Sequence, residues 1–458
     1  MIVVSHRGPF GFTVDGSGAL HAVRGPGGLA GTLNHLVESG ELADATCVSA
    51  ALGDGDHRVA RGESHPDVGT DVCFVELDPE AHRLHYEVVS NEVLWFLFHG
   101  IFDLPRSPTF GHAFRDAWAA YVAVNRAFAD RVGELAPDGD LVLVQDYPLG
   151  LVPGMLADDR PDLRLCYFAH TPFSGPGGMR MLPDHVAHEL SASLARRPCG
   201  FHTRRWADAY EGSTRMVLGP DASIAPTFAA SLGPDPAGLA ESAASPAVQA
   251  AHTELDELVG DRALVYRSDR IDLTKNIARG FMAYDELLTT HPEWRERVVF
   301  VAKLNPSRAN VPEYAAYSAE TEHAAERVNE RWATSTWTPL VVDTRDDYER
   351  TVAGFLRYDV LLVNPIKDGL NLVAKEGPLV NTRDGVLCLS PEAGAYEELS
   401  EAALRVHPYD LEQTADALHR ALSMPADERA ARARGLRNAA AARTPSLWLE
   451  DLIAHAMR

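Results

Sequence analysis

Residues 360–376 read Val-Leu-Leu-Val-Asn-Pro-Ile-Lys-Asp-Gly-Leu-Asn-Leu-Val-Ala-Lys-Glu. The first four residues form a continuous apolar run, which is typical of a strand buried on both faces of a parallel sheet. A proline follows the run, an Asp-Gly pair (Asp368–Gly369) marks a turn, and a helical pattern begins after it. The stretch therefore predicts a strand, a turn and a helix, which is the repeating unit of an α/β fold.

The same alternation extends along the chain on both sides of this stretch. Short apolar runs predict strands over Ile2–Ser5, Thr46–Ala50, Val72–Leu77, Leu141–Gln145, Leu163–Ala169, Ala263–Arg267, Val298–Lys303, Leu340–Asp343, Val360–Val363 and Val386–Leu389. Helical patterns such as Ala113–Leu135 and Thr414–Met424 lie between them. Residues 219–257 are rich in Pro, Gly, Ala and Ser without strong periodicity, which indicates the end of one α/β domain, a connector, and a lead-in helix to the next domain.

Charge and cysteine content narrow the class of protein. The 458 residues include 42 Lys+Arg against 65 Asp+Glu, a net charge of −23, which disfavours nucleic acid and anionic membranes as partners. The five cysteines are widely spaced without a CxxC pair, so a reducing compartment is expected. No run of about 18 apolar residues occurs, and the first residues do not resemble a signal peptide. We therefore expect a soluble, cytoplasmic protein.

The turn and helix after Val363 could serve a phosphorylated ligand. Free backbone N–H groups and the positive end of the helix dipole suit a diphosphate at the helix start. Asp368 could accept bonds from sugar hydroxyls, and Glu376, two turns further along, could reach a ribose diol. Equally, the stretch could be an ordinary strand–turn–helix with Asp368 as the helix N-cap. Spacing alone leaves both interpretations open.

A second cluster of charge, Arg270-Ile271-Asp272-Leu273-Thr274-Lys275-Asn276, directly follows a predicted strand. Arg270 and Lys275 could both contact one diphosphate, although surface charge is the commoner role of a single Lys or Arg. Polar residues also follow three strands of the first half, in Ser5–Arg7, Gln145–Tyr147 and His170–Pro172. Ligands of parallel sheets bind beyond these strand ends.

Taken together, these motifs resemble the trehalose-6-phosphate synthases, retaining glycosyltransferases of family 20. The matching segments are SHRGP at 5–9, GGLAG at 27–31, SNEVLW at 90–95, QDYPLGLVP at 145–153, the loop 270–276, PSR at 306–308 and KDGLNLVAKE at 367–376. The resemblance implies the GT-B fold, with two Rossmann-like parallel-sheet domains facing across a cleft. It places an acceptor-binding domain at 1–235, a nucleotide-sugar-binding domain at 236–440, and a C-terminal helix at 441–458 that returns to the first domain.

The resemblance also implies roles for individual residues. On the donor side it assigns Gly27, Gly28, Arg270, Lys275, Asp368, Gly369, Leu370, Asn371, Leu372, Val373 and Glu376. On the acceptor side it assigns Arg7, Tyr86, Trp95, Asp146, Tyr147 and Arg308. Catalytic roles fall to Asp146, His170, Arg270 and Lys275. No metal or other cofactor is implied, because basic residues can neutralise the diphosphate, and a homo-oligomer is plausible for this family.

Departures from the family pattern concentrate on the acceptor side. The usual SNR reads Ser5-His6-Arg7, HDYHL reads Gln145–Leu149, and a tryptophan often found after the second strand is missing from Cys47–Gly53. The implied reaction is transfer of glucose from UDP- or GDP-glucose to glucose 6-phosphate, giving α,α-trehalose 6-phosphate. Three alternatives stay open: a pseudo-glycosyltransferase joining a nucleotide-activated cyclitol to a cyclitol or sugar phosphate, a glucosylglycerol-phosphate synthase, and a catalytically silent relative.

Overall fold

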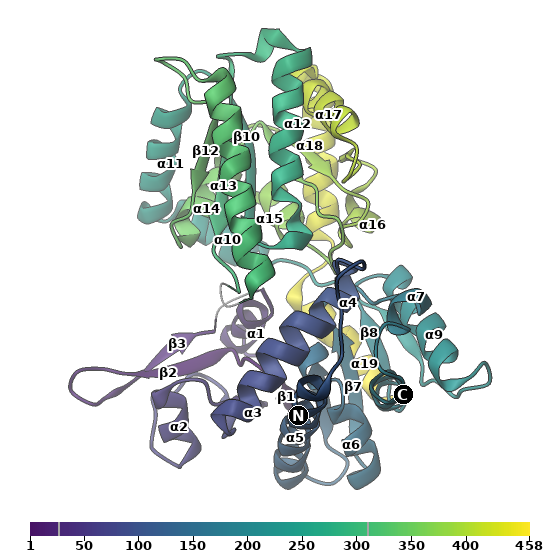
Figure 1. Ribbon diagram of the computed structural model, residues 1–458. Coiled ribbons are helices and arrows are strands. Elements are labelled where there is room, and N and C mark those ends of the chain that lie inside the picture. The colour runs from purple at the N-terminus through teal and green to yellow at the C-terminus, as the bar shows by residue number, and fades with distance from the viewer. Residues whose placement is uncertain (26–27, 309–310) are drawn as a thin grey trace. The chain divides into compact units, whose positions relative to one another are not determined.

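The computed structural model describes residues 1–25, 28–308 and 311–458, and it confirms an α/β fold with two parallel sheets (Figure 1). The chain divides into an N-terminal unit, Met1–Leu232 with Pro445–Arg458, and a C-terminal unit, Gly233–Thr444. Each sheet lies within one unit. In the described part of the chain, no helix combines the length and apolar character needed to cross a membrane.

Within the described residues, the sheet of the N-terminal unit has the strand order β5-β4-β1-β6-β7-β8-β9, and all neighbouring pairs are parallel. The strands are β1 (Ile2–Val4), β4 (Thr46–Ala50), β5 (Asp71–Val75), β6 (Leu141–Gln145), β7 (Arg164–Ala169), β8 (Cys199–Phe201) and β9 (Thr227–Ala229). The predicted strands of this half are confirmed. The strands β8 and β9 escape prediction because three residues are too short for a recognisable apolar run.

Helices cover both faces of this sheet. They are α1 (Gly28–Glu38), α2 (Asp54–Ala60), α3 (Pro79–Arg83), α4 (Trp95–His99), α5 (His112–Leu135), α6 (Val152–Asp159), α7 (Pro176–Met179), α8 (Asp184–Leu194), α9 (Arg204–Leu218) and α19 (Pro445–Ala456). The C-terminal helix α19 packs on β6, β7 and α1, and buries Trp448 edge-on against Phe168. The last residues of the chain thus complete the core of the N-terminal unit.

Besides β8 and β9, a hairpin and a π-helix of the N-terminal unit were not predicted. An antiparallel hairpin, β2 (Phe10–Val14) and β3 (Leu20–Arg24), extends away from the sheet (Figure 1). A π-helix, η1 (Leu84–Leu94), runs directly between α3 and α4. A π-helix of this length is rare, and such segments occur frequently at functional sites.

Within the described residues, the sheet of the C-terminal unit has the order β12-β11-β10-β13-β14-β15 and is parallel throughout. Its strands are β10 (Ala263–Arg270), β11 (Val298–Asn305), β12 (Leu340–Asp343), β13 (Val360–Val363), β14 (Val386–Leu389) and β15 (Leu404–Arg405). Every residue of β13 is buried, as the apolar run predicts. Its neighbour β10 brings the two predicted ligand-binding loops, after Arg270 and after Val363, to the same edge of the sheet.

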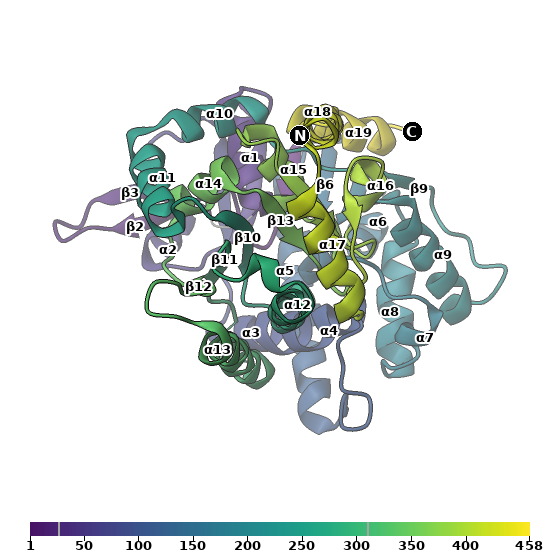
Figure 2. The same cartoon turned by 90° about the horizontal axis from the view of Figure 1, so that it is seen from above.

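The helices of the C-terminal unit are α10 (Pro236–Ala244), α11 (Pro246–Val259), α12 (Ile277–Thr290), α13 (Pro312–Trp332), α14 (Tyr348–Arg357), α15 (Val373–Val380), α16 (Tyr396–Leu399), α17 (Leu411–Ser423) and α18 (Ala426–Ala441). Figure 2 shows α11 and α14 packed together, and α12 beside α17 on the opposite face of the sheet. The stretch 219–257 contains β9, at the edge of the N-terminal sheet, then α10 and most of α11. Asp235 and Ser245 cap its two helices, each of which begins at a proline, and this capping compensates for the weak periodicity.

Candidate active site

The predicted donor residues of the C-terminal unit gather around an ion pair between Lys275 and Asp368. Lys275 ends the short 3₁₀ turn η3 (Leu273–Lys275) after β10, and Asp368 lies in the turn after β13. Both side chains are mostly buried, with exposed fractions of 14% and 13%. A largely buried ammonium at the end of a parallel strand is suited to neutralise a leaving diphosphate.

Asn371 links this ion pair to the start of helix α15. Its side-chain amide donates to Asp368 Oδ2 at 3.1 Å, and its Oδ1 accepts the backbone N–H of Ala374 at 3.2 Å. Its backbone has φ of 78°, a region that asparagine tolerates better than most residues. The side chain bonded to the first turn of α15 therefore belongs to Asn371, whereas Asp368 accepts from the backbone N–H of Leu370 at 3.3 Å. The interpretation of Asp368 as the helix N-cap is wrong in this detail.

Five more of the predicted donor residues lie on the segment that carries Asp368 and Asn371. Gly369 and Leu370 continue the turn, Leu372 precedes α15, and Val373 is its first residue. Glu376 occupies the first turn of the helix, and burial raises the pKa of its carboxyl to about 7. A carboxyl that titrates near neutrality responds to any ligand that binds it, and such groups cluster at functional sites.

The raised pKa of Glu376 predicts how stability depends on pH. The unfolded chain has an ordinary pKa of 4.5, so the folded state favours the neutral acid. This stabilisation is fully present below pH 4.5 and is lost as the pH rises through about 7. Relative to Glu376→Gln, the wild-type protein should therefore lose stability between pH 5 and 8. Melting temperatures of both proteins over this range test the expectation, and parallel curves would contradict it.

Arg308 and Arg270 both act on one buried carboxylate, that of Asp272. Arg308 Nη1 donates to Asp272 Oδ2 at 2.8 Å and to the Tyr314 hydroxyl at 3.1 Å. Asp272 is fully buried, and although burial raises its pKa, the charges of Arg308, Arg270 and Lys275 lower it to about 2. Arg270 itself is exposed at the end of β10. The structure therefore gives Arg308 a structural partner in addition to the acceptor role that the resemblance implies.

Arg267 was not identified from the sequence, yet it fixes the backbone of the Lys275 loop. Its buried guanidinium donates to the backbone oxygen of Lys275 at 2.9 Å. It also donates to Asp269 Oδ2 at 2.7 Å and to Asn364 Oδ1 at 3.2 Å. Asn364 follows β13, so Arg267 joins the two loops that carry the donor residues. An arginine inside a predicted strand gives no sequence signal for such a role.

In the N-terminal unit, the predicted catalytic residues Asp146 and His170 follow the adjacent strands β6 and β7. Asp146 Oδ1 accepts the backbone N–H of His170 at 3.0 Å, and His170 Nε2 lies 3.0 Å from Gln145 Oε1. Burial lowers the pKa of His170 to about 3, so its imidazole is neutral near pH 7. Asp146 has φ of 69° and ψ of 166°, a region that is almost exclusively occupied by glycine.

Two aromatic residues that were not singled out from the sequence complete the surroundings of His170. The ring of His202, which follows β8, lies edge-on at a centroid distance of 5.2 Å. The indole of Trp448, from α19, lies at 5.7 Å. His202 and Trp448 are far from residue 170 in the sequence, so no local motif indicated that they contact it.

The predicted acceptor residues of this unit form two groups. Arg7 follows β1, and its guanidinium carbon lies 5.6 Å from the centroid of the Tyr86 ring, which belongs to the π-helix. Trp95 begins α4, and its ring lies 6.0 Å from that of Tyr147 in the short turn η2 (Tyr147–Leu149). Of the two predicted glycines, Gly28 is the first residue of α1, and Gly27 lies outside the described residues.

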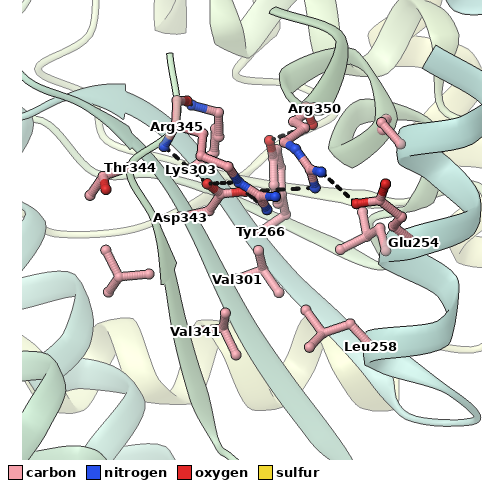
Figure 3. Close-up of a pocket in the computed structure, with 14 residues that line it drawn as sticks. Glu254, Leu258, Tyr266, Val301, Lys303, Val341, Asp343, Thr344, Arg345 and Arg350 are labelled. Carbon is pink, nitrogen blue, oxygen red and sulfur yellow. Dashed lines mark hydrogen bonds and ion pairs between the residues drawn. The ribbon is translucent and has the colours of Figure 1, made fainter. Parts of the chain in front are cut away.

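A cavity of about 410 Å³ lies in the C-terminal unit between α11, α14 and the edge of the sheet (Figure 3). Leu258, Val301 and Val341 line one end, and the other end is charged. There, Arg345 pairs with Asp343 at 2.6 Å and Arg350 pairs with Glu254. None of the predicted site residues lines this cavity. These charged side chains pair with one another, so the lining of the cavity does not indicate one class of ligand.

Among the described residues, one group has ligand atoms close enough to consider a metal ion. The nitrogens or oxygens of His291, Glu293 and His419 lie within 4.8 Å of one another. However, the two imidazole rings are stacked, with centroids 3.7 Å apart and planes 6° from parallel. Imidazole lone pairs lie in the ring plane, so these two rings do not direct them at one ion. The group is a stacked pair at the surface.

Comparison with known proteins identifies the kind of chain that carries these residues. The family model for glycosyltransferase family 20 matches residues 1–458. A bifunctional trehalose-6-phosphate synthase/phosphatase of Thermoproteus tenax is 33% identical over 392 residues, covering 83% of this chain and 52% of the relative. An α,α-trehalose-phosphate synthase (UDP-forming) of Botryotinia fuckeliana is 31% identical, covering 84% of this chain and 75% of the relative.

The chain therefore spans about half the length of the Thermoproteus relative. Among solved structures, one from E. coli bound with UDP-2-fluoro glucose is 26% identical, with a TM-score of 0.84. The match covers 99% of this chain and 98% of that one. The likeness extends through both units.

Proposed function

Because the chain belongs to glycosyltransferase family 20, we propose that it moves glucose from a nucleotide-activated glucose to glucose 6-phosphate, giving α,α-trehalose 6-phosphate. The observation that carries this proposal is the arrangement of Lys275, Asp368 and Asn371 beside the N-terminus of α15. This arrangement offers a cation and free backbone N–H groups to a diphosphate, and carboxylate oxygens to a sugar.

The leaving group governs the chemistry of this transfer. The bond between the glucosyl C1 and the diphosphate oxygen breaks, while a new bond forms between C1 and the acceptor hydroxyl oxygen. The departing phosphate oxygen takes the hydroxyl proton on the same face, so the α configuration is retained. Lys275, Arg270 and the start of α15 stabilise the charge that develops on the diphosphate. This route requires no pair of carboxylates at glycosidase spacing.

In this mechanism, His170 and Asp146 provide fixed, oriented polar groups and do not transfer protons. With a pKa of about 3, His170 is neutral near pH 7 and does not serve as a general acid. Its Nε2 faces Gln145, and Asp146 holds its backbone N–H, so both the ring and the peptide are fixed in orientation. Such fixed dipoles beside the reacting sugar stabilise an oxocarbenium-like state without reorganising during the reaction.

The proposed donor is UDP-glucose, which the UDP-forming relative and the UDP-2-fluoro glucose complex of the E. coli chain support. GDP-glucose is the second candidate. We also propose, from the sequence, that the transfer requires no metal. A cytoplasmic location and a homo-oligomeric state are two further proposals from the sequence. Basic residues at the diphosphate site support transfer without a metal.

One assay tests the proposal and the choice of donor. The purified protein is incubated with glucose 6-phosphate and either UDP-glucose or GDP-glucose, with and without EDTA, and the products are identified by mass. We expect a disaccharide monophosphate with UDP-glucose in both conditions, and none when glucose replaces glucose 6-phosphate. Nucleoside diphosphate release without this product would indicate another acceptor. Silence with both donors would favour the cyclitol-coupling alternative, and loss of activity in EDTA would contradict metal independence.

A further inference from the structure

His6, which stands where the family usually has asparagine, is hydrogen-bonded to a second histidine. His6 Nε2 and His82 Nε2 lie 3.0 Å apart, and the two rings are within 1° of parallel. Their centroids are 5.2 Å apart, about the separation of two imidazoles joined edge to edge by a straight N–H···N bond of normal length. The pair therefore shares one proton between two ring nitrogens.

Burial assigns the direction of this bond. The side chain of His6 is buried, and its Nδ1 has no hydrogen-bond partner among the residues that the structure describes. An orphaned N–H is rarer in proteins than an orphaned acceptor, so the Nδ1 of His6 carries the lone pair and its Nε2 donates. His82 then accepts on Nε2 and carries its own proton on Nδ1. Since His82 is only partly buried, this Nδ1–H is available to a further partner.

The pair lies beside the two residues that the proposed function gives to the acceptor phosphate. The His6 ring stacks on Tyr86 at a centroid distance of 4.2 Å, with His82 at 5.8 Å from the same ring. Arg7 is the next residue after His6, and its guanidinium also lies over Tyr86. Three cationic or titratable side chains thus surround one tyrosine of the π-helix.

The charges that act on the pair come from several elements. On His82, burial and the positive charge of Arg7 lower the pKa, while Glu87 raises it. On His6, burial holds the pKa well below 6.5, and the neighbouring imidazoles of His85 and His82, which repel a proton on His6 when they are protonated, act in the same direction as the charge of Arg7. From α5, the ring of Tyr121 stacks on His85. Burial is the largest of these effects on both groups, so both histidines of the pair are neutral near pH 7 in the free protein, and the charge of Arg7 acts in the same direction.

We propose that the His6–His82 pair extends the acceptor-phosphate site, and that it takes up a proton when an anion binds at Arg7. This proposal rests on the proposed function, which places the phosphate there. An anion offsets the charge of Arg7 and adds a negative charge near His82, and both effects favour imidazolium. The proton enters on His82 Nε2. Two N–H groups cannot face each other at 3.0 Å, so the His6–His82 hydrogen bond opens, and the pair has two discrete states, one bonded and neutral and one open and protonated. His82 becomes a charged donor to the anion, in addition to Arg7.

Proton uptake gives the binding of the anion a defined dependence on pH. Affinity is highest below the pKa of the free pair, which lies under 6.5, and falls as the pH rises through the higher pKa of the complex. A phosphate ester complicates the measurement because it also titrates near pH 6. Glucose 6-sulfate avoids this difficulty, because a sulfate ester keeps a fixed charge over the range from pH 5.5 to 8.5.

The experiment is titration calorimetry of the full chain with glucose 6-sulfate at pH 7, in two buffers of different ionisation enthalpy. We expect the wild-type protein to take up a substantial fraction of a proton on binding, and its affinity to fall about threefold or more between pH 6 and 8. His82→Gln should bind the same ester with no proton uptake and a flat pH profile. His6→Asn, which introduces the residue usual in the family, should also reduce the uptake. His112→Gln, an exposed histidine of the same unit, is the matched control and should match the wild type.

Each outcome either supports or overturns the proposal. Equal proton uptake in the wild-type and His82→Gln proteins would overturn it, as would failure of the wild-type protein to bind glucose 6-sulfate at millimolar concentration. The proposed function fails separately, if no disaccharide monophosphate forms from glucose 6-phosphate while the sulfate ester still binds with proton uptake. A merely structural role for His82 would lower the melting temperature of His82→Gln without changing the proton count.

Discussion

Replacing Lys275 with alanine should lower kcat/KM for the nucleotide-glucose donor by about 100-fold, equivalent to about 2.7 kcal/mol of transition-state stabilisation. Two losses contribute. The ammonium that offsets the diphosphate charge disappears, and the carboxylate of Asp368, its ion-pair partner, is left largely buried without that cation. An uncompensated carboxylate beside a leaving diphosphate adds repulsion to the lost attraction.

A double-mutant cycle separates these two contributions. If the stranded carboxylate matters, Lys275→Ala combined with Asp368→Asn should be less impaired than the sum of the two single variants. Arg270→Ala should cost at least tenfold, because it removes a positive charge from the diphosphate site and one of the charges that act on the buried Asp272. Arg420→Ala, an exposed arginine of α17 paired with Glu428, is the control and should leave kcat/KM unchanged. Near-normal turnover in both Lys275→Ala and Arg270→Ala would refute the diphosphate assignment.

The sequence predicted those parts of the fold that depend on continuous apolar runs. β13 and its following turn were recognisable because four buried aliphatic residues precede a proline and an Asp-Gly pair. The hairpin β2–β3 was not, because its exposed outer residues give it no apolar run. The π-helix η1 was not predicted either, since no local rule distinguishes its spacing from that of an α-helix.

The candidate site was also only partly predictable from the sequence. The residue types that contact a diphosphate or a sugar could be named from motifs, but their mutual contacts depend on which strands become neighbours. Lys275 and Asp368 are 93 positions apart and meet because β10 pairs with β13. The same applies to His6 and His82, whose hydrogen bond joins a strand end to a helix 76 positions away. Arg267 and Asn371 each bond a backbone group as well as side chains, and no sequence pattern reports these contacts.

Asp146→Gly should abolish most activity without reducing stability. Asp146 adopts φ of 69° and ψ of 166°, and a residue with a side chain pays about 1–3 kcal/mol for this region, whereas glycine does not. The variant also loses the hydrogen bond that Asp146 Oδ1 accepts from the backbone of His170, which is worth about 1 kcal/mol. The two effects are of similar size and opposite sign, so the melting temperature should stay the same or rise. Turnover should fall by about 100-fold or more, because the carboxylate that fixes His170 is gone.

Loss of activity together with unchanged or higher stability would show that the strained backbone of Asp146 serves catalysis and not folding. If the conformation at Asp146 served folding, its relief would be neutral for catalysis or would lower the melting temperature. Glu296→Gly provides the matched control, since Glu296 also has a positive φ of 60° but lies on a surface turn outside the predicted site. It should gain stability in the same way and keep full turnover. Asp146→Asn, which preserves the shape and the acceptor oxygen, tests whether the negative charge itself is required. Full activity of Asp146→Gly would show that the strained carboxylate is dispensable, and the catalytic role proposed for Asp146 would then be wrong.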